Sequence, residues 1–408
     1  MPTIFPQITS PHAPLETWQQ QLLQSYCNLS DLLNHGIIST EEATKWKHLG
    51  EKFKVRITPY YAKLMKNSEK CPIRKQAIPS LKEEDPPLPS WATQTSQEVY
   101  GRPTPWDPDP IGDLQKRVAP RITHRYTHRA ILHLSSFCAM YCRFCFRKSH
   151  LNDNEKNLYN GSLEPALRYL QNAREIREII LTGGDPLSLT DSALEKLLKQ
   201  IHEIPHIRTV RIHSRMAVTL PHRFSVPLLS LLNQKWNFQL VLVSHFNHPY
   251  ELTPEAIHSL SQLRRTGITL LNQSVLLNGI NNSVACLSTL FQGLYETGVI
   301  PYYLHHPDWT PGTFHFRVSI EEGQKLVGQL RGRLTGPAVP DYILDIPQGF
   351  GKISLLSSEI KKETEFRNSD PSLLQGAIYT VTAPETRETK ASPHRYFDLY
   401  PPSIYPQV

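Results

Sequence analysis

An α/β fold built around a parallel β-sheet is the fold class that the sequence predicts. From about residue 130 onward, short apolar runs alternate with amphipathic stretches of about ten to fifteen residues. Six candidate strands are matched in this way by six candidate helices, which is the pattern of right-handed crossover units between parallel strands. Periodicity alone leaves two architectures open, an open doubly wound sheet and a partial barrel.

The amino-terminal part of the chain is predicted to be helical and then extended. Residues 15–66 read as helices, and Ser39 or Thr40 precedes Glu42 in a capping-box pattern. Prolines crowd between residues 72 and 120, which prevents long helices and predicts an extended segment that lies on another surface.

The six candidate strands and the helices between them can be placed by residue number. The strands are expected at 130–136, 177–183, 208–214, 238–245, 268–276 and 299–305. The helices are expected at 162–173, 190–203, 223–233, 253–266, 284–297 and 320–332. A further strand-like stretch, "DYILDI", follows residue 340, then a glycine-containing turn and a polar tail that we expect to be loosely ordered.

Composition and charge describe an ordinary globular chain. With 408 residues, the chain is long enough for one large catalytic domain with an appended region, or for two domains. No apolar run has the length of a membrane span, and no secretory signal is recognisable, so we expect a cytoplasmic protein without a membrane partner. The net charge of +7 is spread along the chain, which favours small anionic ligands over nucleic acid.

Half of the six cysteines lie close together. Cys138, Cys142 and Cys145 directly follow the first predicted strand, where parallel sheets place their chemistry. Structural zinc normally takes four ligands, and the nearest candidates, His133 and His150, are each five residues away from the group. Three thiolates without a fourth fit an iron–sulfur cubane with one iron open to a small molecule. The competing interpretation is three thiols without a function.

Motifs along much of the chain resemble those of a known family. The stretch "CAMYCRFC" is similar to the signature of radical S-adenosylmethionine enzymes, and its continuation resembles the lysine 2,3-aminomutase family. The resemblance covers roughly residues 30–380. Its other motifs are "ITPYYAKLM", "CPIRKQAIPS", "THRYTHRAILHLSS", "LTGGDPL", "RIHSRMAVTLP", "SHFNHP", "NQSVLLNGIN", "PYYLHHPD" and "LDIPQGFGK".

The resemblance implies a partial (β/α)6 barrel with the cluster at its mouth. It predicts an amino-terminal helical region with the proline-rich connector at residues 1–118, the barrel at 119–335, and a carboxyl-terminal region at 336–408 that carries a pyridoxal phosphate lysine. The implied cofactors are a [4Fe–4S] cluster on the three cysteines, S-adenosylmethionine and pyridoxal 5′-phosphate.

The resemblance also assigns roles to individual residues. Lys352 is the candidate Schiff-base lysine, and Arg147 matches the arginine that binds the substrate's α-carboxylate. Asp308 and Asp345 match the two acids that hold the ε-ammonium of lysine. Predicted cofactor contacts are Arg125, Tyr126 and Arg129 for pyridoxal phosphate, Gly183, Gly184 and Asp185 for S-adenosylmethionine, and His245 and Gln273 near both. His305 stands where lysine-specific members often carry tyrosine.

The implied reaction converts L-lysine to β-lysine by moving nitrogen from C2 to C3 after a 5′-deoxyadenosyl radical removes a hydrogen from C3. Its electron donor would be a flavodoxin or ferredoxin. No cysteine follows Cys286, so the carboxyl-terminal zinc cluster of longer family members is predicted to be absent, and a homo-oligomer remains open.

Other functions compete with this one. A relative acting on glutamate would need a basic or amide residue at Asp308 or Asp345. An enzyme that supplies β-lysine for modifying elongation factor P would use the same reaction. A non-catalytic iron–sulfur or zinc module would not cleave S-adenosylmethionine and would have no pyridoxal absorbance. A nucleic-acid-modifying radical enzyme would need neither Lys352 nor Arg147.

Overall fold

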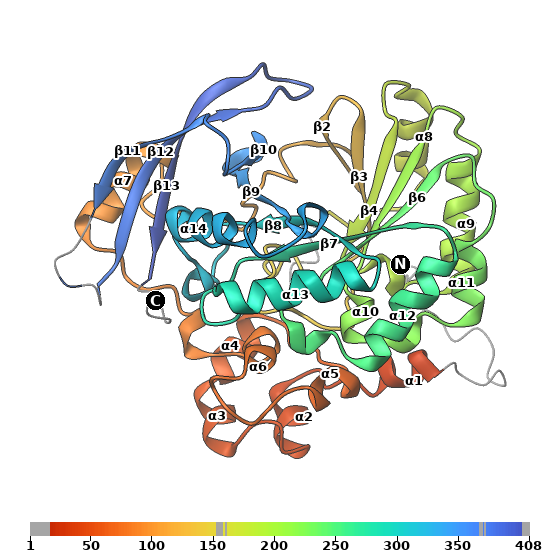
Figure 1. Cartoon of the computed structure of the whole chain (residues 1–408), viewed down its shortest axis with the longest axis horizontal. Helices are drawn as coiled ribbons and strands as arrows, with labels where there is room; N and C mark the ends of the chain where they lie inside the picture. The colour runs from red at the N-terminus through yellow and green to blue at the C-terminus, as the bar shows by residue number, and fades with distance from the viewer. Residues whose placement is uncertain (1–16, 152–157, 160, 367–369, 371–372, 402–408) are drawn as a thin grey trace.

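A computed structural model of the chain describes residues 17–151, 158–159, 161–366, 370 and 373–401. Figure 1 shows a curved central sheet with helices around its outside, a group of short helices below it and a small second sheet at one side. None of the helices in these ranges is both long and apolar enough to span a lipid bilayer.

The central sheet has ten strands, and each strand pairs with the next one along the chain. Neighbours from β3 to β9 are parallel, whereas β1, β2 and β10 pair antiparallel at the two ends. The strands are β1 (Arg117–Ala119), β2 (Ile122–Tyr126), β3 (Arg129–Ser135), β4 (Glu178–Gly183), β5 (Thr209–His213), β6 (Gln239–Ser244), β7 (Thr269–Val275), β8 (Ile300–His305), β9 (Asp341–Ile346) and β10 (Gly351–Ser354).

This strand order decides between the two architectures that periodicity left open. A doubly wound sheet reverses its strand order at a switch point, and this sheet never reverses. Right-handed crossovers that always step in one direction place all the helices on one face, so the sheet curls into a partial barrel. The partial α/β barrel predicted from the sequence is therefore confirmed, and "DYILDI" is its last parallel strand.

The helices expected between the strands are all present, with ends that differ by a few residues. Threonine or serine side chains cap α9, α12, α13 and α14, which explains why these helices begin where they do. The helices are α8 (Glu164–Asn172), α9 (Asp191–His202), α10 (Met216–Thr219), α11 (Val226–Leu232), α12 (Pro254–Arg265), α13 (Val284–Glu296) and α14 (Ile320–Leu330).

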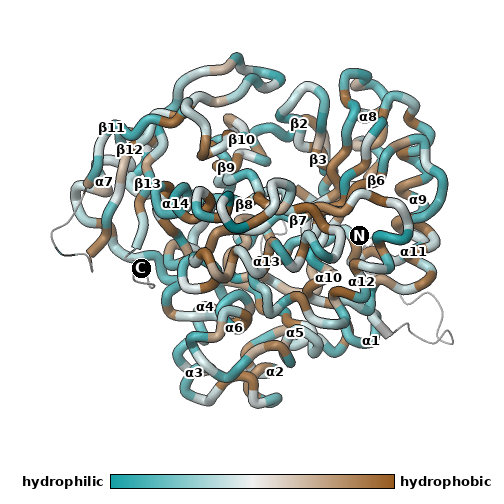
Figure 2. Tube along the Cα trace, viewed as in Figure 1, coloured by the Kyte–Doolittle hydropathy of each residue, from teal (hydrophilic) through white to brown (hydrophobic). Residues whose placement is uncertain are grey.

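The hydrophobic core lies between the helices and the sheet. One face of α9 is buried through Leu194, Leu197, Leu198 and Ile201, as expected for an amphipathic helix. Figure 2 shows apolar residues gathered along β3 and β7, and hydrophilic residues along the outer course of α9.

The amino-terminal region is helical, as predicted. Ser39 caps α3, and the Ser39 hydroxyl and Glu42 carboxylate form the reciprocal capping box. The helices of this region are α1 (Thr17–Leu23), α2 (Leu29–Asn34), α3 (Thr40–Lys45), α4 (Lys47–Lys52), α5 (Pro59–Lys63), α6 (Pro72–Ala77) and α7 (Ser90–Tyr100).

The prediction that residues 72–120 are simply extended is wrong, because α6 and the eleven-residue α7 lie within them. Pro72 occupies the first turn of α6, and Pro89 directly precedes α7. Proline is compatible with both places, because the first turn of a helix needs no donor from its own backbone nitrogens.

The expectation of a loose polar tail is also wrong for the residues described. The strands β11 (Ile360–Phe366), β12 (Gln375–Ala383) and β13 (Ser392–Tyr400) form a separate antiparallel sheet. Apolar side chains of β12 and β13 are buried, and Trp91 of α7 stacks on Phe366 with ring centroids 4.9 Å apart. Residues 402–408, which end the predicted tail, lie outside the described residues.

Candidate functional site

The three clustered cysteines lie on the loop that follows β3, at the carboxyl edge of the parallel strands. Cys138, Cys142 and Cys145 are all half-buried. Burial raises the pKa of the Cys138 thiol well above its usual value and that of Cys145 to about 11, and the neighbouring cysteines add to both shifts.

The arrangement of these thiols suits a cluster better than a single ion. Within the described ranges, no three His, Cys, Asp or Glu side chains converge closely enough to hold one metal ion. In an iron–sulfur cubane each thiolate binds a different iron, so the sulfurs need not meet at one point. The three thiols therefore fit the cluster that the sequence predicts.

Two glycines let strand β4 approach the cysteine loop. A Cβ on Gly183 would lie 2.5 Å from the carbonyl oxygen of Ser135, and one on Gly184 would lie 2.2 Å from that of Phe137. Gly183 also has a φ of 126°, a conformation that side chains disfavour. In this structure the glycines make room for the loop backbone. The contact with S-adenosylmethionine predicted for them remains a prediction.

Asp185 links the glycine turn to the end of β5. Its carboxylate accepts hydrogen bonds from the backbone N–H of Leu187 at 3.0 Å and of Arg215 at 2.7 Å. Burial raises the pKa of Asp185 to about 6, although these hydrogen bonds oppose the shift. The side chain is thus committed to protein contacts that hold the two strand ends together.

Arg215 was not singled out in the sequence, although it lies in the quoted motif "RIHSRMAVTLP". Its guanidinium donates to the Cys142 sulfur at 2.8 Å, and also to Gln76 and Glu251, each at 2.7 Å. Its position just after β5, at the same edge as the cysteines, is the signal that could have found it.

A second missed residue, Glu83, holds the cysteine loop from the amino-terminal region. Its carboxylate accepts two hydrogen bonds from Arg143, at 2.8 and 2.5 Å, and one from Lys148 at 2.9 Å. Arg143 and Lys148 flank Cys145 in the sequence, and all three charged residues are buried. One carboxylate therefore ties together both sides of the loop around Cys145.

His245 and Gln273 lie on or just after neighbouring strands. The ring of His245 lies 5.5 Å from that of Phe144 in the cysteine loop, and its Nε2 atom is buried without a hydrogen-bond partner. Burial lowers the pKa of His245 well below its usual value, so the ring is neutral. Gln273 is half-buried on β7 and pairs in register with Tyr303 of β8.

Lys352 lies opposite Asp345, because β9 and β10 pair antiparallel in that register. The Lys352 ammonium donates to the Asp345 carboxylate, which also lies 3.6 Å from His305 Nδ1 and 3.7 Å from an Arg125 nitrogen. Burial would raise the pKa of Asp345, but the charge of Lys352 and the neighbouring His305 outweigh it and lower the pKa.

The turn before Lys352 depends on its glycines. Gln348, Gly349 and Gly351 all have positive φ angles, of 64°, 81° and 102°. A Cβ on Gly351 would lie 2.9 Å from the Tyr126 hydroxyl, and that hydroxyl accepts a hydrogen bond from the Lys352 backbone N–H at 2.8 Å. The motif "PQGFGK" is therefore built so that β10 can close against β2.

The predicted pyridoxal phosphate contacts lie around Lys352. The Arg129 guanidinium stacks 3.9 Å above the centre of the Tyr126 ring. Arg125 donates to the carbonyl oxygen of Ile111, and its Nε atom is buried without a partner.

The Arg147 guanidinium, predicted to bind a substrate carboxylate, is paired with Asp113 in this structure. Its Nη2 and Nε atoms lie 2.7 and 3.2 Å from one oxygen of Asp113. The other oxygen of Asp113 lies 3.6 Å from Arg125 and has no hydrogen bond. Asp113, which we did not predict, thus lies between the two arginines proposed for substrate and cofactor.

Asp308 and Asp345, predicted to act together, have opposite protonation behaviour. Burial, reinforced by the charge of Asp345, raises the pKa of Asp308 to about 7. Asp308 follows the end of β8 by three residues and Asp345 lies on the neighbouring strand β9, so both acids lie at the carboxyl edge of the sheet.

Several buried polar atoms in this region lack partners, namely Arg125 Nε, Asp113 Oδ1, Asp345 Oδ1 and His213 Nε2. Buried polar groups are normally satisfied, so an unsatisfied group points to a missing ligand or water. Among these atoms, Arg125 Nε could donate to an anionic group, whereas Asp113 Oδ1 and Asp345 Oδ1 could only accept a hydrogen bond from a donor.

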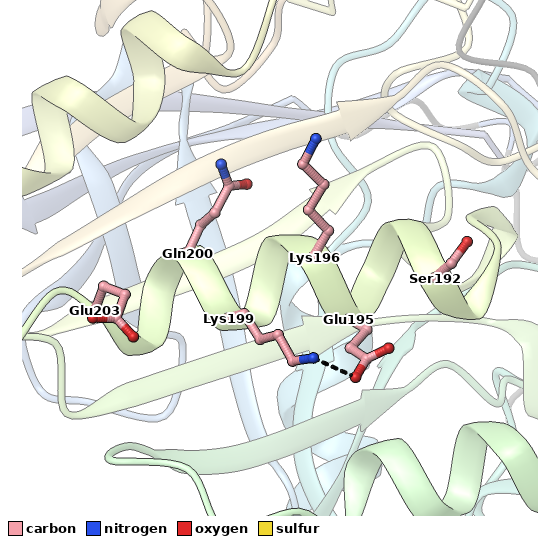
Figure 3. Close-up of a pocket in the computed structure, with 6 residues that line it drawn as sticks. All are labelled: Ser192, Glu195, Lys196, Lys199, Gln200 and Glu203. Carbon is pink, nitrogen blue, oxygen red and sulfur yellow. Dashed lines mark ion pairs between the residues drawn. The ribbon is translucent and has the colours of Figure 1, made fainter.

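Figure 3 shows a hollow elsewhere, on the outer surface of α9, lined by Ser192, Glu195, Lys196, Lys199, Gln200 and Glu203. All six side chains come from α9 or the residue after it, and the Lys199–Glu195 ion pair at 2.8 Å is exposed. This surface lies outside the barrel and contains none of the predicted site residues.

Comparison with known proteins gives independent evidence. Residues 132–225 match the sequence profile of the radical SAM superfamily. An L-lysine 2,3-aminomutase of Fusobacterium nucleatum is 34% identical over 383 residues, which are 93% of this chain and 85% of that protein. An L-lysine 2,3-aminomutase of Methanococcus maripaludis is 36% identical over 358 residues, 86% of this chain and 78% of that protein.

A glutamate 2,3-aminomutase of Clostridioides difficile is 34% identical over 356 residues, which are 86% of this chain and 80% of that protein. Similarity at this level over most of both chains extends from the amino-terminal region to the strand that carries Lys352. Together with the cysteine loop and the partial barrel, it shows that the chain belongs to the lysine 2,3-aminomutase family of radical S-adenosylmethionine isomerases.

Proposed function

We propose that the protein is an L-lysine 2,3-aminomutase that converts L-lysine to β-lysine. The observation that carries the proposal is the placement of two acids at the carboxyl ends of neighbouring strands: Asp345 on β9, paired with Lys352, and Asp308 three residues after the end of β8. A terminal ammonium bound at these acids would replace the contact that Lys352 now makes with Asp345.

The family implies a [4Fe–4S] cluster and S-adenosylmethionine, and the residues present fit them. Cys138, Cys142 and Cys145 would hold the cluster, with the Arg215 guanidinium against the Cys142 sulfur. His245, with its unpartnered Nε2, would face the adenosyl group. When bound, the cluster and S-adenosylmethionine together supply a 5′-deoxyadenosyl radical, which the surrounding strand ends would have to protect from water.

Pyridoxal phosphate is proposed at Lys352. Arg125 and Arg129 would supply guanidinium groups for its phosphate, since arginine matches phosphate geometry. Tyr126 would fix Lys352 through the hydrogen bond to its backbone N–H. The cofactor provides an aldehyde that carries the substrate amine and a ring that delocalises an unpaired electron.

Arg147 would bind the substrate's α-carboxylate. Asp113 holds two of the guanidinium nitrogens, and the third, Nη1, makes only a 3.5 Å contact with Thr182. Arg147 is therefore oriented with donor capacity left over. A glutamate side chain would bring its second carboxylate to Asp308 and Asp345, where like charges repel it.

We also propose a cytoplasmic location, a flavodoxin or ferredoxin as electron donor, and the division at residues 118 and 335 given above. Supply of β-lysine for modifying elongation factor P is consistent with the same reaction on free lysine.

The test is an anaerobic assay of protein reconstituted with iron, sulfide and pyridoxal phosphate, reduced by dithionite and supplied with S-adenosylmethionine. L-Lysine and L-glutamate are offered separately, and products are resolved chromatographically. We expect β-lysine from lysine, and no product in Lys352→Ala or Cys142→Ala. Lys196→Ala, an exposed lysine of α9, is the control and should retain activity. Rearrangement of glutamate but not lysine would contradict the assignment.

A further inference from the structure

A buried charged network joins the carboxyl-terminal sheet to the barrel. At its centre is Arg317, fully buried between β8 and α14. One nitrogen of its guanidinium donates to Tyr396 at 2.9 Å and Asp398 at 3.1 Å, and Nε donates to the carbonyl oxygen of Leu399 at 2.9 Å. All three acceptors belong to β13.

The same guanidinium holds the segment that carries Asp308. It donates to the carbonyl oxygen of Pro307, the residue before Asp308, and it stacks 3.6 Å from the ring centre of Trp309, the residue after it. It also donates to His306 Nε2 at 3.0 Å. Asp308 is therefore bracketed on both sides by residues in contact with Arg317.

His306 is a neutral member of the network around Arg317. Burial lowers the pKa of His306, and its Nδ1 lies 2.8 Å from the Tyr342 hydroxyl. Its Nε2 also lies 3.4 Å from the Asp398 carboxylate. The ring thus ties β9 to the network as well.

The opposite side of the segment is held by the connector. The indole N–H of Trp309 donates to the Tyr100 hydroxyl at 3.2 Å, and the Trp309 carbonyl accepts from the Asp107 N–H at 2.7 Å. The Tyr100 hydroxyl in turn accepts from the Phe397 N–H of β13 at 3.1 Å. Through Tyr100 and Arg317, both neighbours of Asp308 are therefore connected to β13.

We propose that Tyr396 and Asp398 of β13 are positioning residues that act through Arg317 to hold Asp308 in place for the substrate's terminal ammonium. The inference rests on the proposed function, because it takes Asp308 to be an ammonium ligand. It assigns to the carboxyl-terminal sheet a part in substrate recognition, although that sheet contributes no side chain to the site.

The test compares two ligands in the reconstituted holoenzyme, L-lysine and L-norleucine, which has the same chain without the terminal ammonium. Binding of each is followed by the change in pyridoxal absorbance. In Tyr396→Phe we expect the dissociation constant for lysine to rise about threefold or more, where a tenfold rise corresponds to roughly 1.4 kcal/mol of binding free energy. The constant for norleucine should change less than about twofold on the same scale.

Asp398→Asn should weaken lysine binding selectively in the same way, and by a larger factor. If Asp398→Asn does not fold, the result for Tyr396→Phe tests the proposal by itself. Tyr379→Phe is the matched control, because Tyr379 is buried in β12 directly opposite Tyr396. It should leave both constants unchanged, with iron and pyridoxal content equal in all variants.

Equal weakening of lysine and norleucine binding, or no change in either, would overturn the proposal. The proposed function fails in a different way. In that case the unmodified protein would not bind lysine more tightly than norleucine and would form no β-lysine.

Discussion

Asp308 and Asp345 illustrate how the surroundings of one residue decide its chemistry. Asp345 is buried and Asp308 is half-buried, yet the pKa of Asp345 is lowered and that of Asp308 is raised to about 7. Burial disfavours the charge of each. At Asp345 the nearby Lys352, His305 and Arg125 outweigh burial, whereas at Asp308 burial and the charge of Asp345 outweigh the opposing influence of Lys352 and two arginines.

A pH dependence follows at this residue. Because the raised pKa leaves Asp308 protonated below about 7, binding an ammonium there must release a proton, at a cost of about 1.4 kcal/mol per pH unit. We expect kcat/KM for lysine to fall about tenfold per pH unit below pH 7 and to level off above it. A profile that stays flat between pH 6 and pH 8 would contradict this.

The control for that profile is the binding of norleucine, followed by pyridoxal absorbance over the same pH range. Norleucine has no terminal ammonium, so its affinity should lack the step near pH 7. A step in both ligands would assign the titration to another group.

At the scale of elements, the glycine turn after β4 packs directly against the backbone of the cysteine loop and so determines the position of that loop. Gly184→Ala would place its Cβ 2.2 Å from the Phe137 carbonyl oxygen and 2.7 Å from the Phe137 carbonyl carbon, both of which are backbone atoms that cannot rotate away. We expect a loss of about 1–3 kcal/mol in stability, the usual cost of overpacking. The amount of iron bound per chain should fall together with the stability. Unfolding experiments measure the stability, and metal analysis after reconstitution measures the iron.

Gly328→Ala serves as the comparison. Gly328 lies in α14, where an added Cβ would meet nothing within 4 Å. Alanine should stabilise that helix by about 0.5–1 kcal/mol and leave the iron content unchanged. A normal iron content in Gly184→Ala would show that the loop tolerates the displacement.

At the scale of the whole molecule, two regions far apart in the sequence fix segments at the barrel's strand ends through buried ion pairs. We call each of these buried ion-pair contacts a clamp. Glu83 of the amino-terminal region holds the cysteine loop, and β13 of the carboxyl-terminal sheet holds the segment around Asp308. Figure 1 shows α1–α6 below the barrel and β11–β13 at one side of it, where α7 lies beside them.

Glu83→Gln tests the first clamp. The change leaves Arg143 and Lys148 buried without their counter-charge, which typically costs about 3–5 kcal/mol. Although burial alone would raise the pKa of Glu83, the two cations lower it to about 2. Its stabilising contribution is therefore present above the carboxyl's ordinary pKa and is lost as the pH falls toward 2.

We expect Glu83→Gln to lower the urea midpoint and the iron content at neutral pH. The difference in free energy of unfolding between the variant and the unmodified protein should become smaller at acidic pH. Glu41→Gln, which breaks the exposed Lys45–Glu41 pair, should change neither quantity. A Glu83→Gln protein with unchanged midpoint and iron content would rule out the clamp.

Local sequence was sufficient for the strands and helices of the barrel, because alternating apolar periodicity is a property of neighbouring residues. The capping box at Ser39 and the cysteine spacing are equally local, and both were readable from the chain. The resemblance to a family supplied Lys352, Asp308 and Asp345, which no local pattern would have connected.

The tertiary structure decided what depends on contacts between distant segments. Strand order separated the partial barrel from a doubly wound sheet, and pairing in register, rather than composition, turned the supposed tail into β11–β13. Glu83, Asp113, Arg215 and Arg317 escaped prediction because each owes its importance to a partner at least 30 residues away. A buried charge is recognisable only once its surroundings are known, and folding supplies those surroundings.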